Sequence, residues 1–313
     1  MSAWELVVRS VDDAVPGIRT VTLGKADGAA LPSFTPGSHI VIECGPAPSP
    51  ANAYSLTGES VAPTEYVISV LECPAGSGGS RWIHQLSVGD RVIVRPPRSA
   101  FAPVLVARRH LLIAAGIGIT PMISHLRSAG RWGREVRLLY LHRDGRGAYV
   151  DEIKALTDDA QIFTDRAAFM AEVRPELGDQ PLGTHLYLCG PASFMSDVSA
   201  MAVELGWPPS RIHLERFGID TFDPGTPFEV TLTDTGRSFV VGAGESLLEV
   251  LQTHGYEIPN LCRQGVCGEC RIPVAHGKVL HRDLYLSDAE KAAGDSMMSC
   301  VSRADGDRLE LSL

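Results

Sequence analysis

Hydrophobic and polar residues alternate in short runs along the first hundred residues of the chain. Near the N-terminus, Trp4, Leu6 and Val8 alternate with polar neighbours, and Pro-Gly, Gly-Pro and Val-Gly-Asp turns separate the runs that follow. Regular short strands with turn signals between them are typical of an antiparallel β-barrel or sandwich. We therefore predict an antiparallel β domain over residues 1–101, with further short strands at 18–23, 39–44, 66–72 and 91–94.

The pattern of hydrophobic positions changes over residues 102–218, where apolar strands alternate with helical stretches. Such alternation produces βαβ units, whose parallel strands carry helices on both faces of the sheet. We predict an α/β domain with a parallel sheet here. Its strands are expected at 111–114, 136–141, 161–164, 185–188 and 212–214, and its helices at 121–129, 150–156 and 192–205.

A third region follows a short stretch that contains Asp-Pro-Gly and a second proline, which we interpret as a linker over 219–227. Alternating apolar residues at 228–232 and a second apolar run at 239–241 predict a hairpin that turns around 234–237. Leu247, Leu248 and Leu251 then form the apolar face of a helix. A chain of 313 residues is long enough for three domains, the last over 228–313.

Charge is unevenly distributed along the chain, which has a net charge of -9. Residues 219–313 contain 15 acidic and 8 basic side chains, a net of -7, whereas residues 1–218 contain 22 and 20, a net of -2. This excludes the basic footprint that nucleic-acid binding needs. It is compatible with steering towards a basic patch on a protein partner, and solubility alone is the alternative interpretation.

Neither a membrane span nor a signal peptide is expected. The most apolar stretch, 111–123, is interrupted by Gly116, Gly118 and Pro121 and falls short of the ~20 residues that cross a bilayer. The first ten residues carry Glu5 and lack a long apolar core. We therefore expect a cytoplasmic protein, in which structural disulfides are rare.

Four of the seven cysteines have the spacing of a metal cluster site. Four residues separate Cys262 from Cys267, two separate Cys267 from Cys270, and Cys300 follows after 29 more. This is the spacing of plant-type [2Fe–2S] proteins. Gly265 and Gly268 would let the loop wrap tightly around a small cluster. Structural zinc is the alternative, but it prefers repeated C-x2-C pairs.

Two glycine turns are candidates for a nucleotide site. The apolar strand at 111–114 leads through Gly116 and Gly118 to Thr120 and Pro121 at a helix start, where a pyrophosphate could approach the backbone. Proline replaces the third glycine of the usual pattern. The second turn, Cys189-Gly190-Pro191, precedes a helix that carries Met195, and both turns would lie at the carboxyl ends of parallel strands.

Together these features resemble the phthalate dioxygenase reductase family, within the ferredoxin–NAD(P)H reductase superfamily. The resemblance covers essentially the whole chain and keeps the family's domain order. That order is a flavin-binding β-barrel, an NAD-binding α/β domain and a C-terminal β-grasp ferredoxin domain. It rests on the cysteine set, both glycine turns, Tyr54-Ser55-Leu56, Gly78-Gly79-Ser80, Pro97 to Phe101, Glu215-Arg216-Phe217-Gly218, His281-Arg282-Asp283 and Cys300-Val301-Ser302-Arg303.

The resemblance implies FMN on the barrel. Tyr54 would pack on the flavin ring and Ser55 would bond near its redox-active edge, beside Asn52 and Ala53 and the backbone of Ile68 and Val70. Gly78, Gly79 and Ser80 would bind the phosphate. The family usually has arginine at the positions of Asn52 and Ser77. Their loss weakens phosphate pairing, keeps FAD as an alternative to FMN, and leaves Arg81 or Arg95 as compensating candidates.

For the nicotinamide nucleotide, Arg143 and Asp144 follow the second strand of the α/β domain. An acidic residue there suits a ribose hydroxyl and repels a 2′-phosphate, which favours NADH over NADPH. A solvated turn is the other interpretation. The resemblance further implies that Thr120 and Phe217 border the contact between nicotinamide and flavin.

The resulting hypothesis is an NADH-dependent reductase. It would pass electrons through a flavin, which links two-electron and one-electron carriers, to the [2Fe–2S] cluster and on to a partner. The family suggests a terminal oxygenase of the Rieske type as that partner. A P450 acceptor and a non-enzymatic electron carrier or redox sensor are the alternatives, and a monomer is expected.

Overall fold

The computed structural model describes residues 3–45, 51–74, 78–99, 101–215, 217, 225–260, 263, 265, 268–283 and 285–313. These residues form two compact units. The first unit contains residues 1–49 and 54–217, and the second contains residues 50–53 and 218–313. None of the helices in the described part of the chain is long and apolar enough to cross a membrane.

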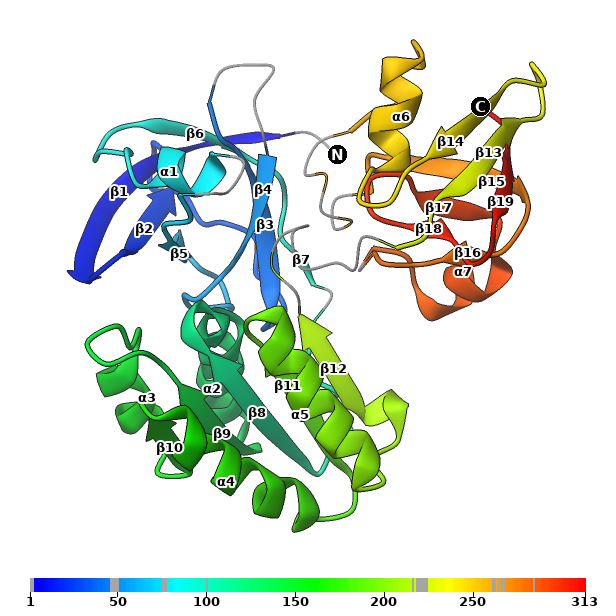
Figure 1. The fold of residues 1–313 in the computed structure, drawn as a ribbon. Coiled ribbons are helices and arrows are strands. Elements are labelled where there is room, and N and C mark those ends of the chain that lie inside the picture. The colour runs from blue at the N-terminus through cyan, green and yellow to red at the C-terminus, as the bar shows by residue number, and fades with distance from the viewer. Residues whose placement is uncertain are drawn as a thin grey trace. The chain divides into compact units, whose positions relative to one another are not determined.

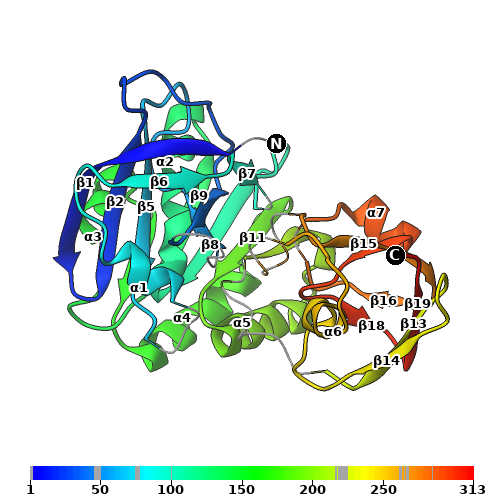
Figure 2. The ribbon, with the colours of Figure 1, turned by 90° about the horizontal axis from the view of Figure 1, so that it is seen from above.

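The N-terminal half of the first unit is a seven-stranded sheet. Its strand order is β4-β3-β6-β1-β2-β5, and β7 pairs with β3. The neighbours β1–β2, β1–β6 and β2–β5 are antiparallel (Figure 2). Strands β3 and β6 are antiparallel as well. Alternate residues such as Leu6 and Val8 of β1 point into one apolar core. The strands are β1 (Trp4–Val15), β2 (Ile18–Gly24), β3 (Ser38–Glu43), β4 (Ala51–Ser55), β5 (Glu65–Leu71), β6 (Arg91–Val94) and β7 (Arg98–Ser99), with the short helix α1 (Gly79–Ile83) between β5 and β6.

A continuous closed barrel, which the sequence led us to expect, is not found among the described strands. The two end strands of the sheet, β4 and β5, approach each other through the isolated bridge between Leu56 and Ile68. The Thr57 N–H still bonds to the Val67 carbonyl oxygen at 2.9 Å. Beyond it the chain leaves the ladder through a loop in which Ala62 has a φ of 47°. Among the described residues the two end strands are therefore joined by one isolated bridge and not by a full ladder.

The C-terminal half of the first unit is a five-stranded sheet of order β10-β9-β8-β11-β12. All four neighbouring pairs are parallel. The strands are β8 (Arg109–Ala115), β9 (Glu135–Leu141), β10 (Ala160–Phe163), β11 (Thr184–Cys189) and β12 (Ile212–Glu215). The helices are η1 (Gly116–Gly118), α2 (Ile119–Trp132), α3 (Val150–Leu156), α4 (Arg166–Gly178), α5 (Ala192–Glu204) and η2 (Pro209–Arg211).

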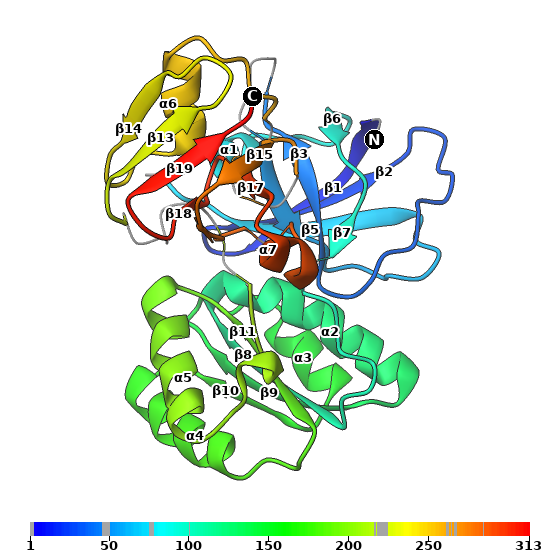
Figure 3. The same cartoon turned by 90° about the vertical axis from the view of Figure 1, so that its right-hand side faces the viewer.

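Helices cover both faces of this parallel sheet. Leu112 and Ala114 of β8 pack in one core with α2 and α3, and the alternate residues Leu111 and Ile113 pack in another with α4 and α5. Figures 1 and 3 show the two helix pairs on opposite sides of the sheet. Helix α4 was not predicted. Asp165 caps it by accepting a hydrogen bond from the Ala168 N–H at 2.7 Å, and Phe169 buries its apolar face.

The second unit is built on a mixed sheet of order β14-β13-β19-β15-β17. The predicted hairpin is present, because β13 and β14 are antiparallel and the Leu232 N–H bonds to the Arg237 carbonyl oxygen at 2.9 Å. Strand β19 then pairs parallel to β13. The elements are β13 (Phe228–Leu232), β14 (Ser238–Val241), α6 (Leu247–Thr253), β15 (Arg271–His276), β16 (Val279–Leu280), α7 (Asp288–Ala293), β17 (Ser296–Met298), β18 (Arg303–Ala304) and β19 (Arg308–Leu311).

Candidate functional site

The two predicted glycine turns meet at the carboxyl ends of β8 and β11. These strands are parallel neighbours, with Cys189 opposite Ala114. Gly118 lies so close to the next turn that a Cβ added to it would overlap the carbonyl of Cys189 and lie 2.8 Å from the nitrogen of Gly190. Glycine is therefore required for the close approach. The carboxyl edge of a parallel sheet is where α/β folds bind nucleotides.

Three of the residues predicted to bind the nucleotide also stabilise the fold. The Thr120 hydroxyl donates to the Ile117 carbonyl oxygen at 2.9 Å and is buried, so it closes the turn that leads into α2. Pro121 lies in the first turn of α2, where its missing N–H costs nothing. The Met195 side chain is buried in the core beneath α5. Contacts of these three residues with a nucleotide stay predictions.

The loop after β9 exposes Arg143 and Asp144. The Gly145 N–H donates to Asp144 Oδ1 at 3.0 Å, and the Arg146 N–H donates to the Arg143 carbonyl oxygen at 2.9 Å. The loop is therefore a tight turn that presents one basic and one acidic side chain. The Ala148 N–H ends it by donating to the hydroxyl of Tyr140 at 3.2 Å.

The predicted flavin residues come together on β4 and β5. The bridge between Leu56 and Ile68 places Tyr54 and Ser55 across from the strand that carries Ile68 and Val70. Tyr54 is half-buried, and its hydroxyl lies 3.9 Å from Cys44 Sγ. The buried Ser55 Oγ has no hydrogen-bond partner among the described residues, which suits an atom that bonds a ligand.

The expected phosphate loop leads into α1. Gly78 precedes that helix with a φ of 101°, which favours glycine, and Ser80 Oγ accepts a hydrogen bond from the Cys73 N–H at 3.0 Å. Of the two departures from the family pattern, Asn52 is half-buried in β4, whereas Ser77 lies outside the described residues. A Cβ added to Gly78 would lie 3.9 Å from the Arg81 guanidinium, so a cation is close to this loop. Arg95 is engaged instead by Glu43 at 3.3 Å.

A buried acid beside these turns was not identified as a site residue from the sequence. Glu215 ends β12 opposite Cys189. Burial raises the pKa of Glu215 to about 8, and the Ser55 hydroxyl opposes that rise. Neither Ser55 Oγ nor Glu215 Oε2 makes a hydrogen bond of ordinary geometry to a described residue. The sequence feature that could have identified Glu215 is a glutamate at the end of a strand expected in the buried parallel sheet.

The nucleotide turns and the flavin strands belong to one continuous region of the first unit. Strand β5 lies against η1, the first glycine turn. Phe217 packs against the core that contains Ala114 and Cys189. A nucleotide on the glycine turns would thus lie beside the strand expected to carry the flavin.

The second unit holds the described part of the cysteine constellation. Cys270 Sγ and Cys300 Sγ are 3.0 Å apart, and each residue is 2% exposed. Cys262 and Cys267 lie outside the described residues. The two described thiols converge in a buried position from segments 30 residues apart, as a shared cluster requires.

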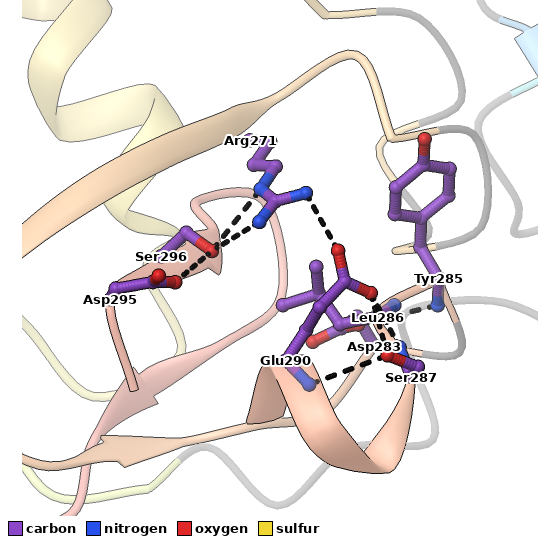
Figure 4. A network of polar contacts seen from close by, with 8 residues as sticks. All are labelled: Arg271, Asp283, Tyr285, Leu286, Ser287, Glu290, Asp295 and Ser296. Carbon is purple, nitrogen blue, oxygen red and sulfur yellow. Dashed lines mark hydrogen bonds and ion pairs between the residues drawn. The ribbon is translucent and has the colours of Figure 1, made fainter. Parts of the chain in front are cut away.

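The loop around these cysteines fits a compact cluster. Gly265 and Gly268 have φ values of 72° and 82°. A Cβ on Gly268 would overlap the ring of Tyr285, and one on Gly265 would lie 2.6 Å from Val301 and 3.0 Å from Asp283. Asp283 accepts a hydrogen bond from the Leu286 N–H at 2.8 Å, so the segment that encloses the loop is itself held in place (Figure 4).

The start of β15 is fixed immediately after Cys270, a predicted cluster ligand. The Arg271 guanidinium donates to Ser296 Oγ at 2.9 Å and to Glu290 at 2.9 Å (Figure 4). Glu290 also closes a capping box with Ser287 at the start of α7. Arg271 therefore ties α7 and β17 to the strand that leaves the cluster site.

The fold and site define a multidomain reductase with a C-terminal iron–sulfur domain. Residues 230–305 match the 2Fe-2S iron-sulfur cluster binding domain, a range that contains all four predicted cluster cysteines. Residues 90–212 match the dimethylamine monooxygenase subunit DmmA-like N-terminal domain. The second unit thus carries the predicted [2Fe–2S] domain.

Whole-chain comparisons give the family. The chain is 35% identical to phthalate dioxygenase reductase of Burkholderia cepacia, covering 98% of this chain and 97% of that protein. It is 39% identical to the heme-dependent oxidative N-demethylase beta subunit of Ectopseudomonas mendocina (strain ymp), covering 98% and 97%. The solved phthalate dioxygenase reductase superposes with a TM-score of 0.71 at 34% identity, covering 100% of this chain and 98% of that one. The chain belongs to the phthalate dioxygenase reductase family, as the motifs predicted.

The chain is also similar to part of a longer protein of known structure. The chain matches part of an intact type IV self-sufficient cytochrome P450 monooxygenase with a TM-score of 0.81 at 32% identity, covering 99% of this chain and 41% of that one. A region similar to nearly this whole chain thus makes up 41% of that longer protein.

Proposed function

We propose that this protein is the NADH-dependent reductase component of an oxygenase system, with FMN in its first unit and a [2Fe–2S] cluster in its second. The observation that carries the proposal is the meeting of the two glycine turns beside β5, in a chain that also buries Cys270 against Cys300. FMN supplies, when bound, the conversion between the two-electron donor and the one-electron cluster.

The chain's own residues bind and orient the two ligands of the first unit. Tyr54 supports the flavin ring, Ser55 Oγ bonds its reactive edge, and the backbone of Ile68 and Val70 lies alongside. The residues assigned to the phosphate are Gly78, Gly79 and Ser80. Those assigned to NADH are Gly116, Gly118, Thr120, Pro121, Arg143, Asp144, Cys189, Gly190, Pro191, Met195 and Phe217.

Glu215 is added to this set as the group that holds a proton beside the reacting ligands. Since burial raises its pKa to about 8, its carboxyl is mainly protonated at neutral pH. Ser55 and Glu215 are both buried, and the Ser55 hydroxyl is close enough to Glu215 to oppose the rise in its pKa. The pair is suited to hold and release a proton at Glu215 Oε2 without admitting bulk water.

Arg81 is the cation that takes over phosphate pairing from the missing family arginines. It is exposed and lies next to Gly78, whereas Arg95 is paired with Glu43. Arg81→Gln should weaken FMN binding about tenfold, an effect on the scale of one charge-assisted hydrogen bond. Fluorescence titration of the flavin-free protein measures it, and Arg95→Gln, which should change FMN affinity far less, is the matched control.

The finer domain layout is part of this proposal. Residues 1–101 would form a flavin-binding β-barrel, 102–218 an NAD-binding α/β domain, 219–227 a linker and 228–313 a β-grasp ferredoxin domain. We also propose a monomer, because a carrier that must dock transiently benefits from an accessible cluster. Thiolate ligands suit the reducing cytoplasm.

The acceptor is proposed to be a terminal oxygenase. The phthalate-type relatives favour an oxygenase of the Rieske type. The relative at 39% identity is named as the beta subunit of a heme-dependent oxidative N-demethylase, which favours a heme acceptor instead. The similarity to part of a self-sufficient cytochrome P450 monooxygenase also favours a heme acceptor. Reduction of a purified heme protein followed by its Soret band, against reduction of a Rieske protein followed by electron paramagnetic resonance, separates these two candidates.

An anaerobic titration of the purified protein with NADH tests the core of the proposal. Bleaching of the flavin absorbance, followed by the paramagnetic signal of a reduced plant-type cluster, is the expected result. Chromatography of the released flavin then distinguishes FMN from FAD. A cluster that dithionite reduces but NADH leaves oxidised, even after FMN is added, would refute a reductase function.

A further inference from the structure

Tyr149 belongs by its backbone to the parallel-sheet half of the first unit, but its hydroxyl bonds to the antiparallel half. It immediately precedes α3. Its hydroxyl oxygen lies 2.5 Å from Ser69 Oγ of β5 and 3.0 Å from Thr57 Oγ1. Both partners are buried, with Ser69 6% and Thr57 0% exposed. The contact is therefore an internal joint between the two halves.

The hydroxyls around Tyr149 form a continuous chain of hydrogen bonds. Thr20 Oγ1 lies 2.7 Å from Ser69 Oγ, and Thr57 Oγ1 donates to the Val67 carbonyl oxygen at 3.1 Å. Since Tyr149 donates to Thr57, Ser69 can donate to Tyr149 and Thr20 to Ser69, so that Ser69, Tyr149 and Thr57 each donate once and accept once. A buried hydrogen-bond network of this kind favours one arrangement of its side chains.

The backbone at Tyr149 is strained. Its φ of 63° and ψ of 15° place a bulky residue in the left-handed region, which L side chains rarely adopt. The backbone of Tyr149 is also held by the start of α3, because the Ile153 N–H donates to the Tyr149 carbonyl oxygen at 2.8 Å. Such strain persists where the surrounding contacts fix the residue, and it is concentrated at functional sites.

The residues on either side of this joint belong to the two proposed ligand sites. Tyr149 ends the loop that carries Arg143 and Asp144, and the Tyr140 hydroxyl fixes that loop one residue earlier through the Ala148 N–H. Across the joint, Ser69 lies between the flavin residues Ile68 and Val70. Thr57 follows Ser55 by two positions and bonds back to β5 through Val67.

We propose that Tyr149 is a positioning residue that couples occupation of the 142–148 loop by the nucleotide to the geometry of the flavin-binding strands. The proposal rests on the function proposed above. Contacts of NADH with the loop would act on the Tyr149 hydroxyl, and through it on Ser69 and Thr57. Coupling of this kind is reciprocal for binding, and it typically changes affinity by 5- to 150-fold.

The test compares two variants that each lose one buried phenol hydroxyl. Tyr149→Phe keeps the ring packed and removes only the joint. Tyr66→Phe is the matched control, because the Tyr66 hydroxyl donates to the Pro32 carbonyl oxygen at 2.8 Å within the antiparallel half alone. In FMN-loaded wild-type protein, NAD⁺ should slow amide hydrogen exchange in the peptide covering residues 65–71. Tyr66→Phe should retain this effect and Tyr149→Phe should lose it.

Rapid-mixing kinetics supply the second readout. The limiting rate of flavin bleaching at saturating NADH should fall about tenfold in Tyr149→Phe, with little change in the NADH concentration that gives half the limiting rate. Ser69→Ala removes the bond between Tyr149 and Ser69 but leaves the bond from Tyr149 to Thr57, so it should give a loss in the same direction that is no larger. The double variant should lose less than the sum of the two single changes, because both remove the bond between Tyr149 and Ser69.

The outcomes separate this inference from the proposed function. If NADH fails to reduce wild-type protein, the reductase function itself is wrong. If wild-type protein is reduced but Tyr149→Phe matches Tyr66→Phe in exchange and in limiting rate, the reductase function stands and the coupling role is overturned. Additive losses in the double variant would also overturn it. Should Tyr149→Phe not fold, Ser69→Ala carries the same comparison alone.

Discussion

Glu215 and Cys189 occupy neighbouring positions on the parallel strands β12 and β11, and both side chains are buried. Burial, followed by the charge of Glu215, raises the pKa of the Cys189 thiol. Cys189 is therefore a neutral thiol that lines the turn. Glu215 is the member of the pair that titrates near physiological pH.

Glu215 should make the protein less stable as the pH rises. Its native pKa of about 8 lies above the reference value of 4.5, so the native state binds more protons than the unfolded chain between these values. This contribution to stability is lost as pH rises towards 8, at up to about 1.4 kcal/mol per pH unit. Urea unfolding of Glu215→Gln should show a stability advantage that grows from pH 5 to pH 8. A constant difference across that range would contradict the assignment.

The histidine cluster on one face of the parallel sheet should make the protein less stable as the pH falls. The rings of His110, His125 and His213 contact Tyr187, and His185 stacks on His213. Arg134 and Arg211 are the neighbouring cations. Burial lowers the pKa of His125 to about 3 and that of His213 to about 4. Since both values lie below the unfolded value of about 6.5, stability present above pH 6.5 is lost as the pH falls towards 4.

Thermal unfolding measured between pH 7 and pH 4.5 checks this effect. His125→Phe keeps an aromatic ring beside Tyr187 and removes one titrating group, so its melting temperature should fall less steeply with acidification than that of the wild type. His276→Phe, on the second unit, is the control and should leave the slope unchanged. Equal slopes in all three proteins would count against the cluster.

Asp144 should set the preference for NADH. Its exposed carboxylate would repel a 2′-phosphate at the ribose. Asp144→Ala should narrow the ratio of kcat/KM for NADH over NADPH at least tenfold, mostly through better use of NADPH. Asp151→Ala is the comparison variant, because it removes the same charge from the first turn of α3. An unchanged ratio in Asp144→Ala would favour the solvated-turn interpretation.

Gly268 should be essential for the cluster because a side chain there meets the Tyr285 ring. Gly268→Ala should lower the iron content per chain severely. Gly236→Ala separates steric overlap from backbone strain, since Gly236 also has a positive φ, 66°, but nothing lies within 4 Å of its added Cβ. That control should cost about 1 kcal/mol in stability and leave the iron content unchanged. Equal iron loss in both variants would rule out the overlap as the cause.

Local patterns in the sequence predicted the elements with strong periodicity. The strand Arg91–Val94 and the helix Val150–Leu156 were found at their observed bounds. Helix α4 was missed, because Pro175 interrupts its pattern and only Phe169, Val173 and Leu177 are buried. The strand Arg271–His276, which contains Pro273, and the shorter strands that follow it were also missed.

The site was predictable where chemistry depends on residue type and spacing, and less so where it depends on register. Both glycine turns were identified, but their contact follows from the pairing of β8 with β11. Glu215 acquires its pKa only through burial beside Ser55. Tyr149 carries no sequence signal, because its role exists only once two halves of the unit meet.

The convergence of Cys270 and Cys300 also matters for how the second unit comes to exist. The 29 residues between them form a closed loop once both thiolates share one cluster, and closing such a loop removes conformational entropy from the unfolded chain. The cluster is then a cross-link as well as an electron carrier. Iron starvation would consequently deplete this protein through unfolding and proteolysis of the second unit, while the first unit could still hold its flavin.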